Sequence, residues 1–217
     1  MFHLHRNSQK RVYEEGAEYF VTTVTHERHP YFANPILAEL FVRDLWFAKE
    51  LKQFELFGYT VMPDHVHLLI QPRGRANYSE IMRSIKTNFS RDANDIILNR
   101  VDRFSIPPAG DVAPRRLRDQ TTSNTMTSHR LRRFQKHYSN VVIPLLKRFV
   151  AKYGLNHGIP PFKWQSSFRD HVIRDEEDYL NHLEYTYNNA VKHGLVGESE
   201  QYPFMWITGM KSPFAPE

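Results

Sequence analysis

Residues 55–71, ELFGYTVMPDHVHLLIQ, constrain the fold more than any other stretch of the chain. Two runs rich in apolar and β-branched residues, 55–62 and 65–71, are separated only by Pro63 and Asp64. A connection this short, made of turn-forming residues, predicts a β-hairpin. The two runs should therefore be neighbouring antiparallel strands.

The rest of the chain supplies further strands and helices around this hairpin. Strands are predicted at 17–25 and 167–174, and helices at 34–54, 77–98 and 175–193. The helix starts carry their own signals, which are Asn34 before Pro35, the capping box Asn77 to Glu80, and Asp175 before an acidic first turn. The order predicts an α+β fold with a ferredoxin-like (split βαβ) antiparallel sheet and helices on one face. A C-terminal helix bearing tyrosines and a long insertion before the fourth strand are additions to that fold.

The insertion covers about residues 100–160 and interrupts the periodic pattern. Residues 103–130 are rich in turn residues and predict a mobile basic segment, followed by a helix at 140–154 that ends at Gly154. Positive charge concentrates at Arg115, Arg116, Arg118, Arg130, Arg132, Arg133 and Lys136. Two interpretations are open: an arm that contacts phosphates, and a solvated loop. We expect residues 1–217 to form one domain that includes this insertion.

The composition limits where the chain works and what it binds. The 217 residues contain no cysteine, which excludes disulfides and thiolate metal sites and fits a reducing compartment. No apolar run approaches the roughly 18 residues of a membrane span, so a cytoplasmic protein with no membrane partner is expected. The net charge of +5 favours a polyanionic partner such as nucleic acid.

His65 and His67 share one face of the second hairpin strand. Strand alternation places them with Leu69 and Gln71, whereas Val66, Leu68 and Ile70 point to the opposite, apolar face. We expect the apolar face to pack on helices and the histidine face to stay partly open. The histidines are either ordinary half-exposed residues or two ligands of a divalent ion that needs a third ligand. Asp64 is a candidate ligand or supporting group, but its alternation favours a role in the turn.

The last helix contains a tyrosine beside an amide on its polar face. A helical projection predicts an apolar packing stripe of Leu180, Leu183, Tyr187, Ala190 and Val191. Tyr185 and Asn189 lie nearly opposite this stripe and neighbour each other at the i, i+4 spacing. Tyr185 is either a surface tyrosine or a nucleophile, and in the second case Asn189 is a candidate for the missing metal ligand.

Two blocks of the sequence resemble a known family. YTVMPDHVHLLIQP resembles the HUH signature of single-tyrosine transposases, and WQSSFRDHVIRDEEDYLNHLEYTYNNAVKHGLV resembles the terminal block of REP-associated tyrosine transposases. The resemblance covers residues 17–99 and 161–205 in the expected order. The chain departs from the family in its long insertion and in Ala190, which stands where many relatives carry proline.

The resemblance implies a chemistry for each of these residues. His65, His67 and Asn189 would bind Mg²⁺ or Mn²⁺, and Tyr185 would attack single-stranded DNA. The products would be a 5′-phosphotyrosine and a free 3′-hydroxyl, formed on hairpins of palindromic repeat DNA by a nucleoid-associated monomer or homodimer. The alternatives are a hairpin-binding protein without catalysis and a metal-dependent phosphodiesterase that uses water. Tyr attack favours break-and-rejoin chemistry, because the covalent bond conserves energy for rejoining.

Overall fold

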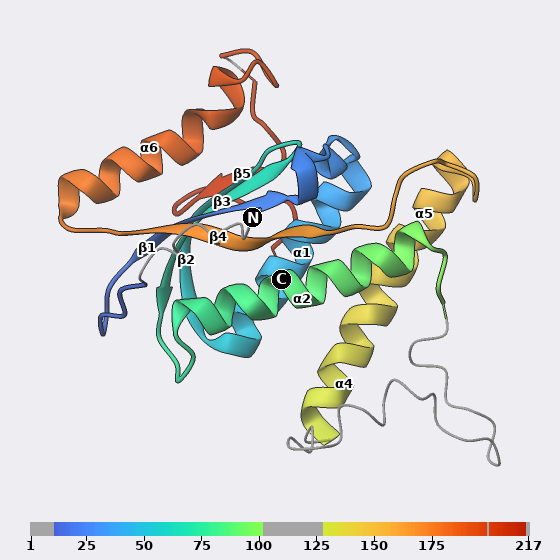
Figure 1. Ribbon diagram of the computed structural model, residues 1–217, viewed down its shortest axis with the longest axis horizontal. Helices are drawn as coiled ribbons and strands as arrows, with labels where there is room; N and C mark the ends of the chain where they lie inside the picture. Colours follow the sequence, from blue (N-terminus) through green and yellow to red (C-terminus); the bar gives the residue numbers. More distant parts are fainter. Residues whose placement is uncertain (1–10, 102–127, 199, 216–217) are drawn as a thin grey trace, which may run out of the picture. The chain divides into compact units, whose positions relative to one another are not determined.

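The computed structural model describes residues 11–101, 128–198 and 200–215 (Figure 1). These residues fall into two compact units, one formed by the parts of the chain up to 91 and from 162 onward, the other by 92–161. Among the described residues, no helix is both long and apolar enough to cross a bilayer. The single transposase domain expected over 1–217 stays a prediction.

The first unit is built on a five-stranded antiparallel sheet with the order β4-β1-β3-β2-β5. The strands are β1 (Tyr19–Thr25), β2 (Phe54–Val61), β3 (His65–Pro72), β4 (Trp164–Val172) and β5 (Met205–Ile207). The first four strands have the ferredoxin-like order, so the predicted fold class is confirmed. The hairpin of β2 and β3 forms as expected, with Val61 paired to Val66. The short edge strand β5 was not predicted.

The helices of this unit begin where their sequence signals predict. They are α1 (Pro35–Lys52), α2 (Tyr78–Ile97), which continues into the second unit, and α6 (Glu176–Lys192). The Asn34 side chain accepts a hydrogen bond from Ile36 N at 3.0 Å. Asn77 and Glu80 exchange two bonds of 3.0 Å in a capping box. Asp175 accepts from the backbone of Asp178 at 2.8 Å and so caps α6.

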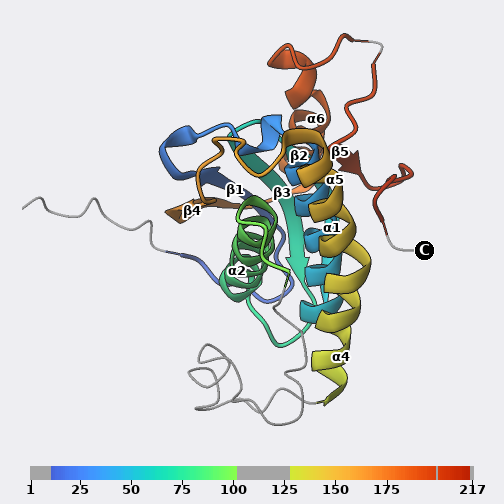
Figure 2. The ribbon, with the colours of Figure 1, turned by 90° about the vertical axis from the view of Figure 1, so that its right-hand side faces the viewer.

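The two faces of the sheet are covered by different helices. The helices α1 and α2 lie on one face and α6 on the other (Figure 1, Figure 2). On the first face, Val66, Leu68 and Ile70 are fully buried, as the alternation predicted. The other face was expected to stay partly open. Instead α6 covers it, and Leu69 and His67 are buried at 0% and 5% exposure.

The second unit is helical. It contains α4 (Ser128–His137), the π-helical turn η3 (Tyr138–Val142) and α5 (Ile143–Tyr153), which ends at Gly154 as predicted. The Tyr138 hydroxyl donates to the carbonyl of Arg100 at 2.9 Å, and a ring nitrogen of His157 lies 3.0 Å from the carbonyl of Ile97. These bonds join η3 and the segment after α5 to the end of α2 and the residues that follow it. The helix α4 was not predicted, because its sequence is mostly polar and basic and offers only Leu131 and Phe134 as apolar residues.

Candidate active site

His65 and His67 lie side by side on the middle strand of the sheet. Strand β3 is flanked by β1 and β2, and His67 is aligned with Thr22 on one side and Thr60 on the other. The two imidazole centroids are 4.8 Å apart with their planes nearly perpendicular. A central strand fixes both rings more firmly than a loop would, which suits a pair of metal ligands.

Each imidazole uses the same nitrogen for support and leaves the other one available. The Nδ1 atom of His67 lies 2.8 Å from the hydroxyl of Thr22, and Nδ1 of His65 lies 2.6 Å from a carboxylate oxygen of Asp64. Supporting bonds of this kind fix the orientation and tautomer of metal-binding histidines. Both Nε2 atoms therefore remain as the candidate ligands.

Asp64 lies in the turn between β2 and β3, as predicted, and it also contacts His65. Alternation predicted a turn residue on the opposite face, but the regular strand begins only at His65. The carboxylate of Asp64 is therefore free to bond His65, and it also accepts from Arg28 at 2.9 Å. Burial opposes ionisation of Asp64, yet the hydrogen bonds from His65 and Arg28 hold its pKa below the usual range.

Burial keeps His67 uncharged. Desolvation, together with repulsion from His65, His193 and His182, lowers the pKa of His67 to about 3. A neutral imidazole has the lone pair that a metal ligand requires. His67 is therefore ready to bind a cation at neutral pH without first losing a proton.

Tyr185 approaches this pair from α6. Its hydroxyl lies 3.5 Å from Nε2 of His67, and the two rings meet edge to face with centroids 5.2 Å apart. Phe20 supports the tyrosine ring from another side, at 5.8 Å. Tyr185 is still 37% exposed, so part of this residue remains accessible to solvent.

Asn189 is the buried polar residue of the same helix face. It lies one turn after Tyr185 and one turn before His193, whose ring centroid is 6.5 Å from that of His65. Because its neighbours on both sides approach the histidine pair, Asn189 faces the pair as well. Its side chain has 0% exposure, and neither its oxygen nor its nitrogen has a hydrogen-bond partner among the described residues. Burying an amide that has no hydrogen-bond partner costs free energy unless a ligand or ion binds it. The amide oxygen of Asn189 and the Nε2 atoms of His65 and His67 are ligands that suit a divalent cation.

The predicted packing stripe of α6 was wrong for Leu180 and Tyr187, although Ala190 is buried as predicted. Leu180 and Tyr187 are 54% and 47% exposed, whereas the buried residues of the helix are Asp178, Thr186, Asn189 and Ala190. The prediction assumed that a helix buries its most apolar face. Here α6 packs on the histidine face of the sheet through the polar residues Asp178, Thr186 and Asn189.

Sequence reasoning missed three residues around the pair: Thr22, Phe20 and His193. Thr22 could be found only from the register of β1 against β3, which the sequence does not give. Phe20 stacks on His67 at 5.3 Å and reads as an ordinary strand residue in the sequence. His193 was interpreted as part of the helix end, and it is indeed the C-cap of α6.

The arginines predicted to bind DNA fall outside the first unit. Arg130, Arg132 and Arg133 lie on α4, on a helix rather than in the expected loop. Arg115, Arg116 and Arg118 lie outside the described residues. Their role in binding stays a prediction.

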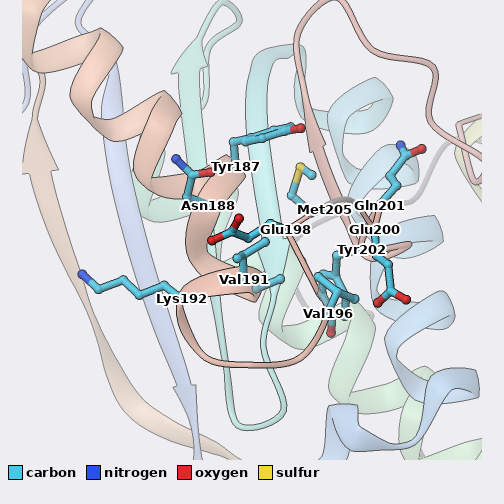
Figure 3. A pocket seen from close by; sticks show the side chains of 11 residues that line it. Tyr187, Asn188, Val191, Lys192, Val196, Glu198, Glu200, Gln201, Tyr202 and Met205 are labelled. Carbon is cyan, nitrogen blue, oxygen red and sulfur yellow. The ribbon is translucent and has the colours of Figure 1, made fainter.

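A cavity of about 390 Å³ lies on another side of α6 (Figure 3). Tyr187 and Val191 line it from the helix, and Tyr202 and Met205 line it from the C-terminal segment. The Tyr202 hydroxyl anchors this segment by donating to the carbonyl of Val61 at 2.8 Å. Neither Tyr185 nor the histidine pair lines the cavity. The candidate active site is thus separate from this cavity.

Comparisons with known proteins bear on the family resemblance predicted from the sequence. The family described as "Transposase IS200 like" matches residues 14–104, which include the histidine pair. A Haemophilus influenzae protein whose name places it among the REP-associated tyrosine transposases is 27% identical over 205 residues, 91% of this chain and 84% of that protein. The chain is therefore similar to the IS200-like and REP-associated tyrosine transposases.

Two further comparisons are more limited. The Escherichia coli REP-associated tyrosine transposase is 46% identical over 58 residues, which are 27% of this chain and 32% of that protein. A solved structure described as a REP-associated tyrosine transposase bound to a REP hairpin has a TM-score of 0.51 and 20% identity, covering 92% of this chain and 82% of that one. At that identity the likeness shows the fold alone. The family resemblance predicted from the two sequence blocks is confirmed.

Proposed function

We propose that this transposase cleaves and rejoins single-stranded hairpin DNA through Tyr185, with His65, His67 and Asn189 holding Mg²⁺ or Mn²⁺. One observation carries the proposal: the hydroxyl of Tyr185, a residue that is 37% exposed, lies 3.5 Å from the available Nε2 of His67. A nucleophile beside a candidate metal ligand is the arrangement that attack on a phosphodiester needs. The fully buried, unpartnered amide of Asn189 supports a third ligand from the same helix.

Each residue of the candidate site has its own role in the proposed cleavage step. When bound, the divalent ion acts as a Lewis acid on the scissile phosphate. Thr22 and Asp64 hold the two imidazoles in place, and neutral His67 presents its lone pair. Tyr185 attacks the phosphorus through its hydroxyl oxygen, and the proton of that hydroxyl is lost. The bond to the 3′-oxygen breaks, this oxygen takes up a proton, and Tyr185 is left joined to the 5′-phosphate.

Rejoining is the reverse of this step. A 3′-hydroxyl attacks the phosphotyrosine, the bond to Tyr185 breaks, and the phenol regains its proton. No external energy source is required, because the phosphotyrosine conserves the energy of the phosphodiester. Water would serve for hydrolysis alone, so the tyrosine supports strand transfer over nuclease action.

Hairpin DNA is the substrate that the family comparison supports. The solved relative is described as bound to a REP hairpin, and the net charge of +5 favours a polyanion here. We expect either a monomer or a homodimer to bind it.

The decisive experiment uses a hairpin oligonucleotide labelled at its 3′ end, incubated with the protein and Mn²⁺. Wild type should yield a labelled covalent adduct that survives denaturing electrophoresis, and Tyr185→Phe should yield none. Tyr187→Phe is the matched control, because Tyr187 lies on the same helix, is 47% exposed and lines the separate cavity. Its adduct should match wild type.

The other outcomes identify the alternatives. Cleavage that persists in Tyr185→Phe would assign the reaction to water and a phosphodiesterase. Hairpin binding by wild type with neither cleavage nor adduct would assign a binding protein without catalysis. Loss of the adduct in both tyrosine variants would point to damage of α6 rather than to a nucleophile.

Helix α4 supplies the testable part of the proposed phosphate-contacting arm. Arg130, Arg132 and Arg133 occupy one short helix, and replacing all three with serine should weaken hairpin binding for every sequence. The dependence of binding on salt should also flatten, because fewer counterions are released. Binding and salt dependence equal to wild type would contradict a phosphate contact.

A further inference from the structure

A second cluster of imidazole and carboxylate groups lies where β4 meets α6. It consists of His171 on β4 and of Asp178 and His182 on α6. The Nε2 atom of His171 is 2.8 Å from one carboxylate oxygen of Asp178, and Nδ1 of His182 is 3.1 Å from the other. The three ligand atoms all lie within 4.8 Å of one another.

Phe20 separates this cluster from the histidine pair. Its ring stacks on His67 with centroids 5.3 Å apart and contacts His182 at 4.6 Å. An ion held by His171, Asp178 and His182 would therefore be bound apart from one held by His65 and His67. None of the three residues has a role in the proposed strand transfer.

The charges of the cluster suit a cation. Burial opposes ionisation of Asp178, but hydrogen bonds from His171 and Arg174 hold its pKa far below the usual range. Arg174 contacts the carboxylate through its backbone N at 3.1 Å and its Nε at 3.2 Å. The Arg174 side chain is 73% exposed, so its guanidinium can move into water when an ion approaches.

The ligand set selects the class of ion. Imidazole and carboxylate ligands suit Zn²⁺ and similar transition ions, whereas Mg²⁺ prefers oxygen atoms in a strict octahedron. In a tetrahedral zinc site, bonds of about 2.0 Å place neighbouring ligand atoms about 3.3 Å apart. The measured separations of 2.8 and 3.1 Å from the carboxylate to the imidazoles are close to that spacing.

We propose that His171, Asp178 and His182 form a second metal site, which binds Zn²⁺ or a similar transition ion and fastens α6 to β4. The three side chains would fill three positions of a tetrahedron, with water in the fourth. Each ligating nitrogen must offer its lone pair, so a proton on Nε2 of His171 or Nδ1 of His182 would move to the other nitrogen of the same ring. The ligand His182 lies three residues before Tyr185 on the same helix, and Phe20 contacts both rings. The ion would thus set the position of the tyrosine helix on the sheet without entering the reaction. This proposal does not depend on the proposed strand transfer.

The test counts Co²⁺ ions, because Co²⁺ takes zinc sites and its visible absorption reports tetrahedral coordination. Metal-stripped wild type and the double variant His65→Ala/His67→Ala are titrated by calorimetry and absorption. The double variant should retain one equivalent with tetrahedral absorption. Adding His171→Ala to it should remove this equivalent, and so should adding His182→Ala.

Two controls separate ligand loss from misfolding. His26 also lies near a carboxylate, 3.9 Å from Glu27, but no third ligand completes a group there among the described residues, so His26→Ala should leave Co²⁺ binding unchanged. In the otherwise wild-type chain, Zn²⁺ should raise the melting temperature, and His171→Ala should lower the zinc affinity of this site at least about tenfold. Loss of a supporting group alone costs about 10- to 100-fold, and His171 would be a direct ligand.

Two results would overturn the proposal. One is a His65→Ala/His67→Ala protein that is folded by circular dichroism and binds no Co²⁺. The other is a tetrahedral Co²⁺ signal that persists in the His65→Ala/His67→Ala protein after both His171 and His182 are also replaced. Either result would leave the cluster as a hydrogen-bond network between β4 and α6.

Discussion

The two faces of strand β3 differ in polarity, because one packs apolar side chains and the other carries the histidine pair. On the face toward α1 and α2, Val66, Leu68 and Ile70 are fully buried among apolar groups. On the face toward α6, His67 is buried at 5% exposure beside polar side chains of the helix. The first face gains free energy from the removal of apolar surface from water. On the second face, the burial of polar groups such as His67 costs free energy, which offsets part of that gain.

This difference teaches how the fold supports a reactive site. Asn189 is as fully buried as Leu68, yet its amide has no partner among the described residues. A natural protein keeps such a group where function requires it and where the remaining core can bear the cost. Residues of the apolar face should therefore control stability, and residues of the α6 face should control metal binding and chemistry.

The largest effect on stability is expected for Leu68→Ala on the apolar face. The side chain has 0% exposure, so its loss should lower the free energy of unfolding by about 2–5 kcal/mol. Urea denaturation measures this change. The amount of covalent adduct per folded molecule, measured below the melting transition, should stay at the wild-type level. A loss of adduct without a loss of stability would contradict the separation of the two faces.

Much of the first unit could be predicted from the sequence because its signals are local. Alternation marked β3, and the side chains of Asn34, Asn77 and Asp175 marked helix starts that the hydrogen bonds confirm. The strand β5 has only three residues, Met205–Ile207, which is too short for any pattern. It forms because the edge of β2 is available, and that is a tertiary condition.

The candidate site was predictable only in part. His65, His67, Tyr185 and Asn189 could be named from spacing and from resemblance, whereas Thr22 and Phe20 depend on strand register. The face of α6 was predicted wrongly, because hydrophobicity alone cannot show that a helix packs through Asp178 and Asn189. The sequence pattern identifies candidate site residues, but the contacts between α6 and the sheet determine which face of the helix is buried.

The second prediction compares two neighbouring threonines of β1 that point to opposite faces. Thr22→Val removes the hydroxyl that lies 2.8 Å from Nδ1 of His67, and it should weaken Mn²⁺ binding at the histidine pair by about 10- to 100-fold. Thr23→Val is the matched control, because the Thr23 hydroxyl is buried on the other face with no partner among the described residues. It should leave Mn²⁺ affinity unchanged. Calorimetry of metal-stripped proteins measures both, and equal losses would show that the hydroxyl of Thr22 does not support His67.

The third prediction concerns Asn189→Ala, a truncation inside a fully buried position. Its free energy of unfolding in EDTA should stay within about 1 kcal/mol of wild type, because removing an unpartnered amide offsets the lost packing. Mn²⁺ should stabilise wild type against urea and should stabilise the variant much less. A loss of about 3 kcal/mol in EDTA would instead mean that Asn189 is an ordinary core residue of the kind that Leu68 represents.

The smallest effect is expected for Leu180→Ser on the outer face of α6. The apolar stripe that the sequence predicts includes Leu180, but the side chain is 54% exposed. The substitution should therefore change the free energy of unfolding by no more than about 0.5 kcal/mol, as for other surface sites. Urea denaturation of the two proteins side by side measures the difference. A cost of about 2 kcal/mol would show that Leu180 is buried in solution, since that is the free energy of burying a leucine side chain. The helix would then pack through its apolar stripe, and Tyr185 would be turned away from His67.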